Sequence, residues 1–363
     1  MRTFVKLATV ALLVATSGFT SSAPKAAVVQ DVTTLQSIGP LTLGPNDVLF
    51  AADTKGAAIF ALELGAAAKG GVPGAKDVPQ IDQKIAALLG TDAASIAVTD
   101  LAVHPTTRNA FIAVMRGQGA DAKPALVRVD GDGKLEAIAL AELKSTHAAL
   151  PNPPAAATTA RRNPRADSIT DMTFVNGKLI VAGLSNEEFA SKLRTISYPF
   201  ASVEPGTSVE IYHGNHGQLE TRSPVYAFVP YNVAGTPHLI AGYLCTPLVK
   251  FPVASLTGTQ KVVGTTIAEL GSGNRPLDMV VYKKDGREFL LMSNTNRGVM
   301  KIPTEGFASA APITARVGGT AGVGYETIAT MTGIEQMDLL DAQRSIVLAR
   351  TAGALNLQAV PLP

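Results

Sequence analysis

Thr99-Asp100-Leu101-Ala102-Val103 recurs in modified form three more times along the chain. The later copies are Thr170-Asp171-Met172-Thr173-Phe174, Leu277-Asp278-Met279-Val280-Val281 and Met337-Asp338-Leu339-Leu340. In each copy an aspartate opens a short apolar strand, and a turn and a second apolar strand follow. A supersecondary unit that repeats every ~50–70 residues is typical of radial β architectures. The repeat therefore predicts an all-β fold, a β-propeller in which the four aspartates mark equivalent strand starts.

The stretch around the first copy predicts one complete repeat unit, or blade. We expect its strands at 100–103, 110–115, 125–129 and 135–140, with the turn Asp130-Gly131-Asp132-Gly133 before the last strand because such turns need positive φ. Aligning the rest of the chain on this unit predicts six blades, with seven as the alternative. The first strands of the six blades begin near 41, 100, 171, 225, 278 and 338.

The N-terminal part of the chain carries two further expectations. Basic Arg2 and Lys6, the apolar run Leu7–Val14 and small residues after it predict a secretory signal peptide over 1–27. The stretch Ala26–Gln36 is expected to close the last blade as its outer strand, because pairing with the C-terminal strand removes an exposed sheet edge. Residues 28–363 then form a single propeller domain in a periplasmic or secreted protein.

Composition restricts the class of partner. The chain has 363 residues, 46% of them hydrophobic, and a net charge of +2, which suits a globular protein with a sizeable core. This charge balance does not favour nucleic acid as a partner. No other apolar run approaches the length of a transmembrane segment. We also expect the protein to be a monomer. Cys245 is the only cysteine, so no internal disulfide is possible, and we interpret it as a small buried hydrophobe.

Two long insertions interrupt the blades, at 144–168 and 184–207. Long loops in a compact domain are usually functional or mobile. The second insertion carries aromatic residues and paired charges, so we expect it to be an ordered lid. Because strands alternate in direction, the connections after the second and the fourth strand of a blade share one face. Both insertions belong to that face, which we predict to be the binding face.

Candidate ligand- or cation-binding residues lie in these connections and at the repeated strand starts. Oxygen ligands from Asp and Asn suit Ca²⁺ or another hard cation. The alternative is that each repeated Asp bonds backbone amides of its own or the next blade, and the recurrence of the Asp with the blade favours this interpretation. The candidates are Asp100, Asp171, Asn186, Glu187, Glu188, Arg194, Asp278, Asn294, Asn296 and Asp338.

His213-Gly214-Asn215-His216 is a separate candidate for metal binding. A two-residue turn at Gly214-Asn215 would bring the two histidines together, and His238 could approach from the next blade. Copper is the metal that imidazole ligands in this compartment favour. Alignment on the first complete blade places this turn on the face opposite to the binding face. A surface turn is therefore the favoured alternative.

The stretches Thr99–Pro105 (TDLAVHP) and Leu126–Leu135 (LVRVDGDGKL) resemble the periplasmic NHL- and YVTN-type β-propeller repeats. The resemblance covers nearly the whole mature chain at the level of the repeat, and it implies a propeller of six or seven blades. Propellers of this kind include lactonases, dehydrogenases and pure binding modules, so no activity follows from it. Similarity to lactonase-like propellers would imply a channel Ca²⁺ held by Glu, Asn and Asp.

Two functional hypotheses follow. The first is a secreted or periplasmic binding or scaffold protein that holds a small molecule, a cation or a periplasmic protein at the channel mouth, under the 184–207 loop. The second is a metal-dependent enzyme using the same face, either a lactonase-like hydrolase or a periplasmic oxidoreductase. The sequence does not decide whether the protein is an enzyme.

Overall fold

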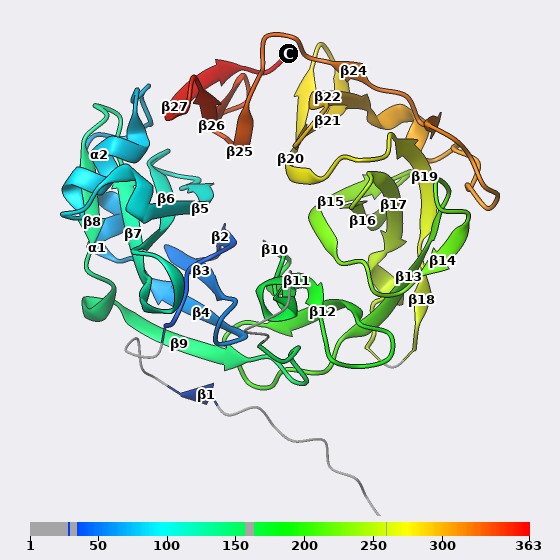
Figure 1. Cartoon of the computed structure of the whole chain (residues 1–363), viewed down its shortest axis with the longest axis horizontal. Helices are drawn as coiled ribbons and strands as arrows, with labels where there is room; N and C mark the ends of the chain where they lie inside the picture. Colours follow the sequence, from blue (N-terminus) through cyan, green and yellow to red (C-terminus); the bar gives the residue numbers. More distant parts are fainter. Residues whose placement is uncertain (1–27, 30–34, 157–162, 259) are drawn as a thin grey trace, which may run out of the picture.

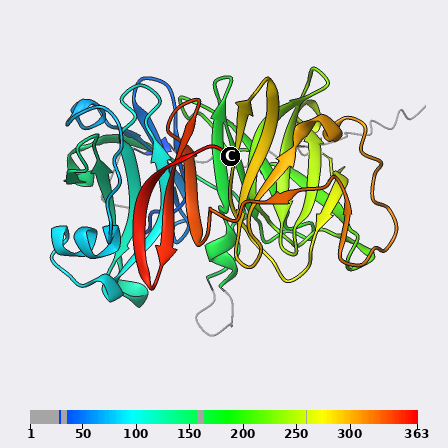
Figure 2. The ribbon, with the colours of Figure 1, turned by 90° about the horizontal axis from the view of Figure 1, so that it is seen from above.

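Six blades surround a central channel in the computed structural model, which describes residues 28–29, 35–156, 163–258 and 260–363 (Figure 1). The expected all-β, six-bladed propeller is confirmed. Seen edge-on, the strands run across the thickness of a flat ring (Figure 2). The expected signal peptide at 1–27 lies outside the described residues. No helix in the described part of the chain has the length and apolar character needed to cross a bilayer.

Blades 1 to 3 contain the following strands, named from the channel outwards. Blade 1 has β2 (Leu41–Leu43), β3 (Val48–Asp53), β4 (Ala58–Glu63), β9 (Lys144–Ala149) and β1 (Val28–Val29). Blade 2 has β5 (Ile96–Val103), β6 (Ala110–Arg116), β7 (Lys123–Val129) and β8 (Leu135–Ile138). Blade 3 has β10 (Asp171–Val175), β11 (Lys178–Leu184), β12 (Ser191–Ser197), β13 (Thr207–His213) and β14 (Gln218–Glu220), with β18 (Val262–Val263) beside β13.

Blades 4 to 6 complete the ring. Blade 4 has β15 (Val225–Val233), β16 (Thr236–Tyr243), β17 (Pro247–Pro252), β19 (Thr265–Leu270) and β23 (Thr320–Gly322). Blade 5 has β20 (Pro276–Lys284), β21 (Arg287–Asn294), β22 (Gly298–Pro303) and β24 (Glu326–Thr327). Blade 6 has β25 (Ile334–Leu339), β26 (Arg344–Thr351) and β27 (Ala354–Pro361).

Short helices lie in the connections. They are α1 (Ala66–Lys69), α2 (Ile81–Leu88), η2 (Ala93–Ser95), η3 (Gly119–Asp121), η4 (Leu140–Glu142), η5 (Pro164–Asp167), η6 (Val253–Ser255) and η7 (Thr304–Phe307). Helix α2 buries Ile81 and Ile85 against strands of blades 2 and 6. It therefore seals the junction between these two blades from outside.

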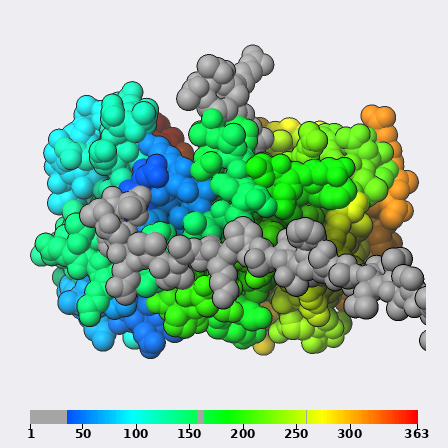
Figure 3. Space-filling model, turned by 90° about the horizontal axis from the view of Figure 1, so that it is seen from below, coloured from blue at the N-terminus to red at the C-terminus, as the bar shows by residue number. Residues whose placement is uncertain are grey.

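The blades do not follow one another in chain order around the ring. The inner strands contact one another in the order β5, β2, β10, β15, β20, β25 and back to β5. Blade 2 consequently lies between blades 1 and 6, and blade 1 lies between blades 2 and 3. In Figure 3 the blue part of the surface, which belongs to blade 1, lies between cyan and green parts.

This order arises because the chain returns to blade 1 after completing blade 2. Strand β9 pairs along the outer edge of β4, from Ala58 opposite Ala149 to Glu63 opposite Lys144. The first insertion therefore begins as a blade strand. It then leads into blade 3 on the other side of blade 1, and the remaining blades follow in sequence.

The last blade is closed differently from our expectation. The N-terminal strand β1 pairs with β9 of blade 1, not with the C-terminal strand. At the outer edge of β27, Val78 exchanges two backbone hydrogen bonds with Leu357, of 2.9 and 3.0 Å. The segment before α2 thus covers the edge that the N-terminal stretch was expected to cover.

The second insertion is also not a lid. Residues 191–197 form β12, which pairs with β11 along its whole length. Blade 3 therefore has one strand more than expected before His213. Because each added strand reverses the chain direction, the turn after His213 lies on the predicted binding face instead of the opposite one.

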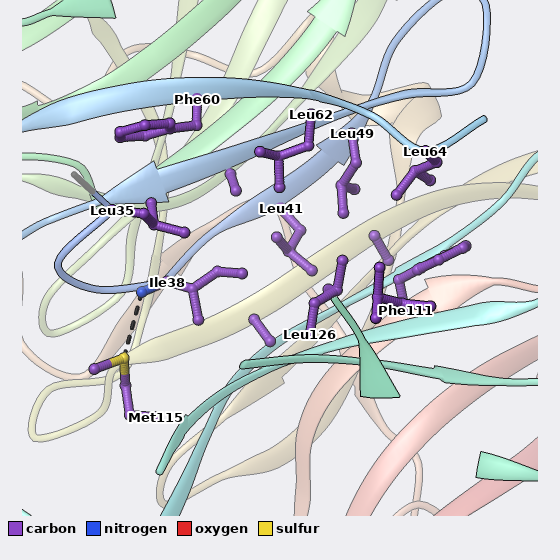
Figure 4. Packing of buried hydrophobic residues seen from close by; sticks show 14 of the residues in the cluster. Leu35, Ile38, Leu41, Leu49, Phe60, Leu62, Leu64, Phe111, Met115 and Leu126 are labelled. Carbon is purple, nitrogen blue, oxygen red and sulfur yellow. Dashed lines mark hydrogen bonds between the residues drawn. The ribbon is translucent and has the colours of Figure 1, made fainter. Parts of the chain in front are cut away.

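The core consists of six apolar clusters, one between each pair of neighbouring blades. Figure 4 shows the cluster between blades 1 and 2, where Leu49 and Leu62 face Phe111 and Leu126, all fully buried. Burial of apolar side chains between wedge-shaped blades holds the ring closed and leaves the axis to polar groups.

Candidate functional site at the channel mouth

The four repeated aspartates line the central channel, a cavity of about 470 Å³. Each lies on an inner strand, is half-buried, and accepts hydrogen bonds from two backbone N–H groups. One donor is the following residue in the chain, and the other belongs to a neighbouring blade. The interblade bonds join Asp100 to Leu41 N (2.5 Å), Asp171 to Phe228 N (2.7 Å), Asp278 to Met337 N (2.8 Å) and Asp338 to Val103 N (2.7 Å).

Burial of these carboxyls raises their pKa values. The pKa of Asp100 rises to about 8, and that of Asp338 to about 6. Burial also places the pKa values of Asp171 and Asp278 well above the usual range, and repulsion between carboxylates across the channel adds to this effect. Gln336, with its amide oriented to satisfy its neighbours, donates to Asp100 Oδ1 (2.8 Å) and Asp278 Oδ2 (3.2 Å).

The donor set does not fit a channel Ca²⁺. Both oxygens of Asp171, Asp278 and Asp338 already accept a backbone N–H, so these carboxylates serve as links between blades. These hydrogen bonds support a structural role for the repeated aspartates, as links between neighbouring blades.

A second cavity, of about 790 Å³, lies where the channel opens on the predicted binding face. It shares Pro40, Thr99, Thr170, Tyr226, Leu277 and Gln336 with the channel, so the two are continuous. We call it the mouth pocket. Its charged lining residues are Lys55, Arg165, Asp167 and Arg275, which gives an excess of cations. Ile38, Ile96 and Met115 from blades 1 and 2, together with Ile169 before blade 3, form an apolar wall.

Arg165 is placed by the first insertion. Pro164 begins η5 and Asn163 Oδ1 accepts from Arg165 N at 3.1 Å, which caps this short helix. The Arg165 guanidinium donates to Pro154 O (2.5 Å) and Lys55 O (3.3 Å), so it bridges the insertion and blade 1. The short green helix η5 projects from the lower face of the ring in Figure 2.

Arg275 enters the pocket from the connection between blades 4 and 5. Its guanidinium lies 5.0 Å from the centroid of the Tyr226 ring, a cation–π contact. Its backbone N–H donates to Thr295 Oγ1 at 3.0 Å. The two arginines thus reach the mouth from two different connections, one before blade 3 and one before blade 5. Gln336 lines both the mouth pocket and the channel.

The other predicted site residues mostly serve local structure. Glu187 pairs with Lys192 and accepts from Asn152 Nδ2 (3.1 Å), which lowers its pKa although burial opposes this. Asn186 and Glu188 are exposed in the turn before β12. Asn294 and Asn296 stabilise the turn after β21 through bonds to Gly298 O (3.3 Å) and Gly273 O (2.6 Å). None of these residues lines the mouth pocket.

Arg194 is buried in β12 with only 1% of its surface exposed. None of its three guanidinium nitrogens has a hydrogen-bond partner among the described residues. Burial lowers its pKa to about 10, although Glu187 opposes the shift. Arg194 is therefore not placed to contact a ligand in the mouth pocket.

Replacing this unpaired cation is expected to stabilise the fold. Arg194→Met keeps most of the side-chain length and removes a buried charge, so we expect the free energy of unfolding to rise by about 1–3 kcal/mol. Urea denaturation of both proteins measures the difference. Lys192→Met on the same strand is the matched control, because Lys192 is paired with Glu187 and its loss should destabilise. A lower stability of Arg194→Met would contradict the account.

The histidine cluster lies elsewhere on the same face, at the rim between blades 3 and 4. His213 and His216 are together, as expected, with ring centroids 3.8 Å apart. Their neighbour is Cys245 in the turn between β16 and β17, not His238. His238 lies near the start of β16, at the end of the strand opposite to Cys245, and bonds Thr236 O at 2.8 Å. Its expected approach to the cluster is wrong.

Comparisons with known proteins give no family. No family model matches the chain, and no curated protein matches it. Among solved structures, the extracellular domain of a putative one-component system from B. thetaiotaomicron has 8% identity and a TM-score of 0.37, over 92% of this chain and 40% of that chain. A PQQ-bound aldose sugar dehydrogenase from Streptomyces coelicolor has 11% identity and a TM-score of 0.29, over 93% and 100%.

A third solved structure, the Bacteroides ovatus xyloglucan protein GH43B, has 10% identity and a TM-score of 0.36, over 74% of this chain and 53% of that chain. The chain thus spans about half or less of the length of the first and third structures. The six-bladed assignment rests on the chain's own sheet topology.

Proposed function

We propose that the chain is a periplasmic or secreted binding protein that holds a small organic anion in the mouth pocket. Three cationic side chains, those of Lys55, Arg165 and Arg275, line the pocket, against one carboxylate, that of Asp167. The pocket therefore favours a negatively charged group. Its volume of about 790 Å³ is within the range of sites for small organic ligands. The apolar wall provides for a hydrocarbon body beside that charge.

The observation that carries this proposal is the convergence of cations and apolar surface where the channel opens. A larger cavity, of about 1040 Å³, lies beneath the 309–326 segment beside β22. That cavity is lined mainly by small and apolar residues of one connection, and Arg287 at its edge is already paired with Glu305 at 2.7 Å. The mouth pocket has polar groups from several blades converging on it, as specific sites do.

Binding of 3-phenylpropionate and of octanoate, each compared with its neutral amide, tests the proposal. We expect each acid to bind about tenfold or more tightly than its amide, because hydrogen bonds to charged groups contribute about 1.5–3 kcal/mol. The double variant Arg165→Gln, Arg275→Gln should lose this preference. Isothermal titration calorimetry gives both affinities.

The control is Arg222→Gln, Arg316→Gln, which removes two exposed arginines that do not line the mouth pocket. It should bind like the unmodified protein at matched ionic strength. Equal affinity for acid and amide, or the same loss in both double variants, would argue against an anion site at the mouth.

A further inference from the structure

Three side chains with metal-binding atoms converge where blade 3 meets blade 4. His213 ends β13, His216 lies in the turn that follows, and Cys245 lies in the turn between β16 and β17. One ligand atom from each lies within 4.8 Å of the other two. Cys245 has a φ of 63° and donates its N–H to Asn274 O at 2.7 Å, so the tight turn and the next connection hold it in place.

Glu220 orients both imidazoles. Its Oε2 lies 3.0 Å from His213 Nδ1, and its Oε1 lies 2.6 Å from His216 Nδ1. A carboxylate that accepts from Nδ1 fixes the tautomer with a free lone pair on Nε2 and makes that nitrogen a better ligand. Metal-binding histidines in proteins nearly always have such a partner. The arrangement therefore has the orienting layer that a metal site requires.

The second observation is the Nε2 atom of His213. The side chain is 2% exposed, and Nε2 has no hydrogen-bond partner in the part of the chain that the structure describes. The nearest anionic atom is Glu269 Oε2, 3.9 Å away. A buried polar atom without a partner destabilises the folded protein by about 1–3 kcal/mol, so a partner at this nitrogen would be stabilising. A bound cation at this nitrogen would do so.

We propose that His213, His216 and Cys245 bind a borderline-soft transition-metal ion, Zn²⁺ or copper. Two imidazoles and one thiolate suit these ions and not Ca²⁺ or Mg²⁺, which take oxygen ligands. Glu220 and Glu269 supply negative charge around the ion. His216 is 45% exposed on its side chain, so the site opens to solvent and leaves a coordination position for water or an exogenous ligand.

Because Cys245 is the only cysteine, its reactivity reports directly on this site. The experiment uses the untagged full-length protein and Zn²⁺ or Cu²⁺ alone as the probe. Metal analysis after gel filtration should find one ion per chain. Labelling of the thiol by iodoacetamide should slow at least tenfold when Zn²⁺ is present, because a coordinated thiolate is no longer free to react.

His216→Ala keeps the thiol and removes one ligand, so we expect it to lose the protection by Zn²⁺ while labelling without metal stays measurable. His238→Ala, outside the cluster, should keep full protection. Binding of Co²⁺ gives an independent signal, a sulfur-to-cobalt charge-transfer absorption that Cys245→Ser should abolish. The proposal is overturned if Zn²⁺ leaves the labelling rate unchanged, or if His216→Ala is protected as well as the unmodified protein.

Discussion

The free energy of unfolding is expected to decrease as the pH rises from about 4 to about 8. In the folded chain Asp100 keeps its proton up to about pH 8, whereas in the unfolded chain it loses the proton near 3.8. Between these values the folded state binds more protons than the unfolded state, so each step upward in pH favours unfolding. Stability from a raised carboxyl pKa is thus present in acid and lost as the pH approaches the folded value.

The effect is large because several carboxyls act in the same direction. Asp338 contributes between its unfolded value of 3.8 and its folded value of about 6, and the pKa values of Asp171 and Asp278 are also raised. Each pKa unit corresponds to about 1.4 kcal/mol, so the total decrease is on the order of several kcal/mol. Glu220 acts in the opposite direction, because its pKa falls from 4.5 to about 2 on folding. Its stabilising contribution is lost mainly below pH 4.5, so it offsets only a small part of this slope.

Chemical denaturation across this pH range measures the slope. Asp100→Asn removes its titration and keeps an oxygen that can accept from Leu41 N, so the slope should become clearly smaller. Asp341→Asn is the control, because Asp341 is near the surface, pairs with Arg344 and has a lowered pKa. A stability that rises with pH between 4 and 8 would show that the aspartate ring is ionised in the folded protein.

Phe50→Ala is expected to lower the free energy of unfolding by about 3–5 kcal/mol. Phe50 is fully buried at the junction of blades 1 and 3. Its ring stacks on Phe174 at a centroid distance of 5.3 Å and meets Tyr198 edge-on at 5.0 Å. Truncation would leave a cavity that the surrounding strands can fill only in part.

A double-mutant cycle extends this prediction to the order of the blades. Phe174→Ala should be coupled to Phe50→Ala by about 0.5–1.5 kcal/mol, the contribution of an aromatic pair. If the blades followed chain order, blade 1 would lie between blades 2 and 6 and the two residues would not touch. Phe289, between blades 5 and 6, is the control partner for Phe50. Additivity of the Phe50 and Phe174 variants would contradict the observed ring order.

The number of blades could be predicted because the inner strands carry local signals. Alternating apolar residues and the aspartate that precedes them need no information from distant parts of the chain. Helix α2 also carries a local signal, since its buried residues Ile81 and Ile85 recur at helical spacing. Strand β12 was missed because Lys192 and Arg194 made its sequence resemble a charged loop.

The order of the blades could not be predicted in this way. Strand β9 pairs with β4 across about eighty residues of intervening sequence, and pairing of that kind leaves no local pattern. The closure of the last blade by Val78 depends on the same rearrangement, because blade 2 lies beside blade 6. A correct blade count therefore did not give correct neighbours.

The candidate sites show the same division. The recurrence of the aspartates favoured a structural role, and their hydrogen bonds to neighbouring blades agree with it. Arg275 and Gln336 were missed because they stand close to these aspartates without belonging to the repeated phrase. The interpretation of Cys245 as a buried hydrophobe is wrong, because the residue is half-exposed. Its position beside His213 could not be predicted, since it depends on the extra strand in blade 3.

The most direct test of the proposed function is a crystal structure of the protein with bound 3-phenylpropionate. The account predicts its carboxylate between Arg165 and Arg275, with the phenyl ring against the apolar wall of the mouth pocket. Ligand density in the cavity beneath the 309–326 segment, with none at the mouth, would contradict it.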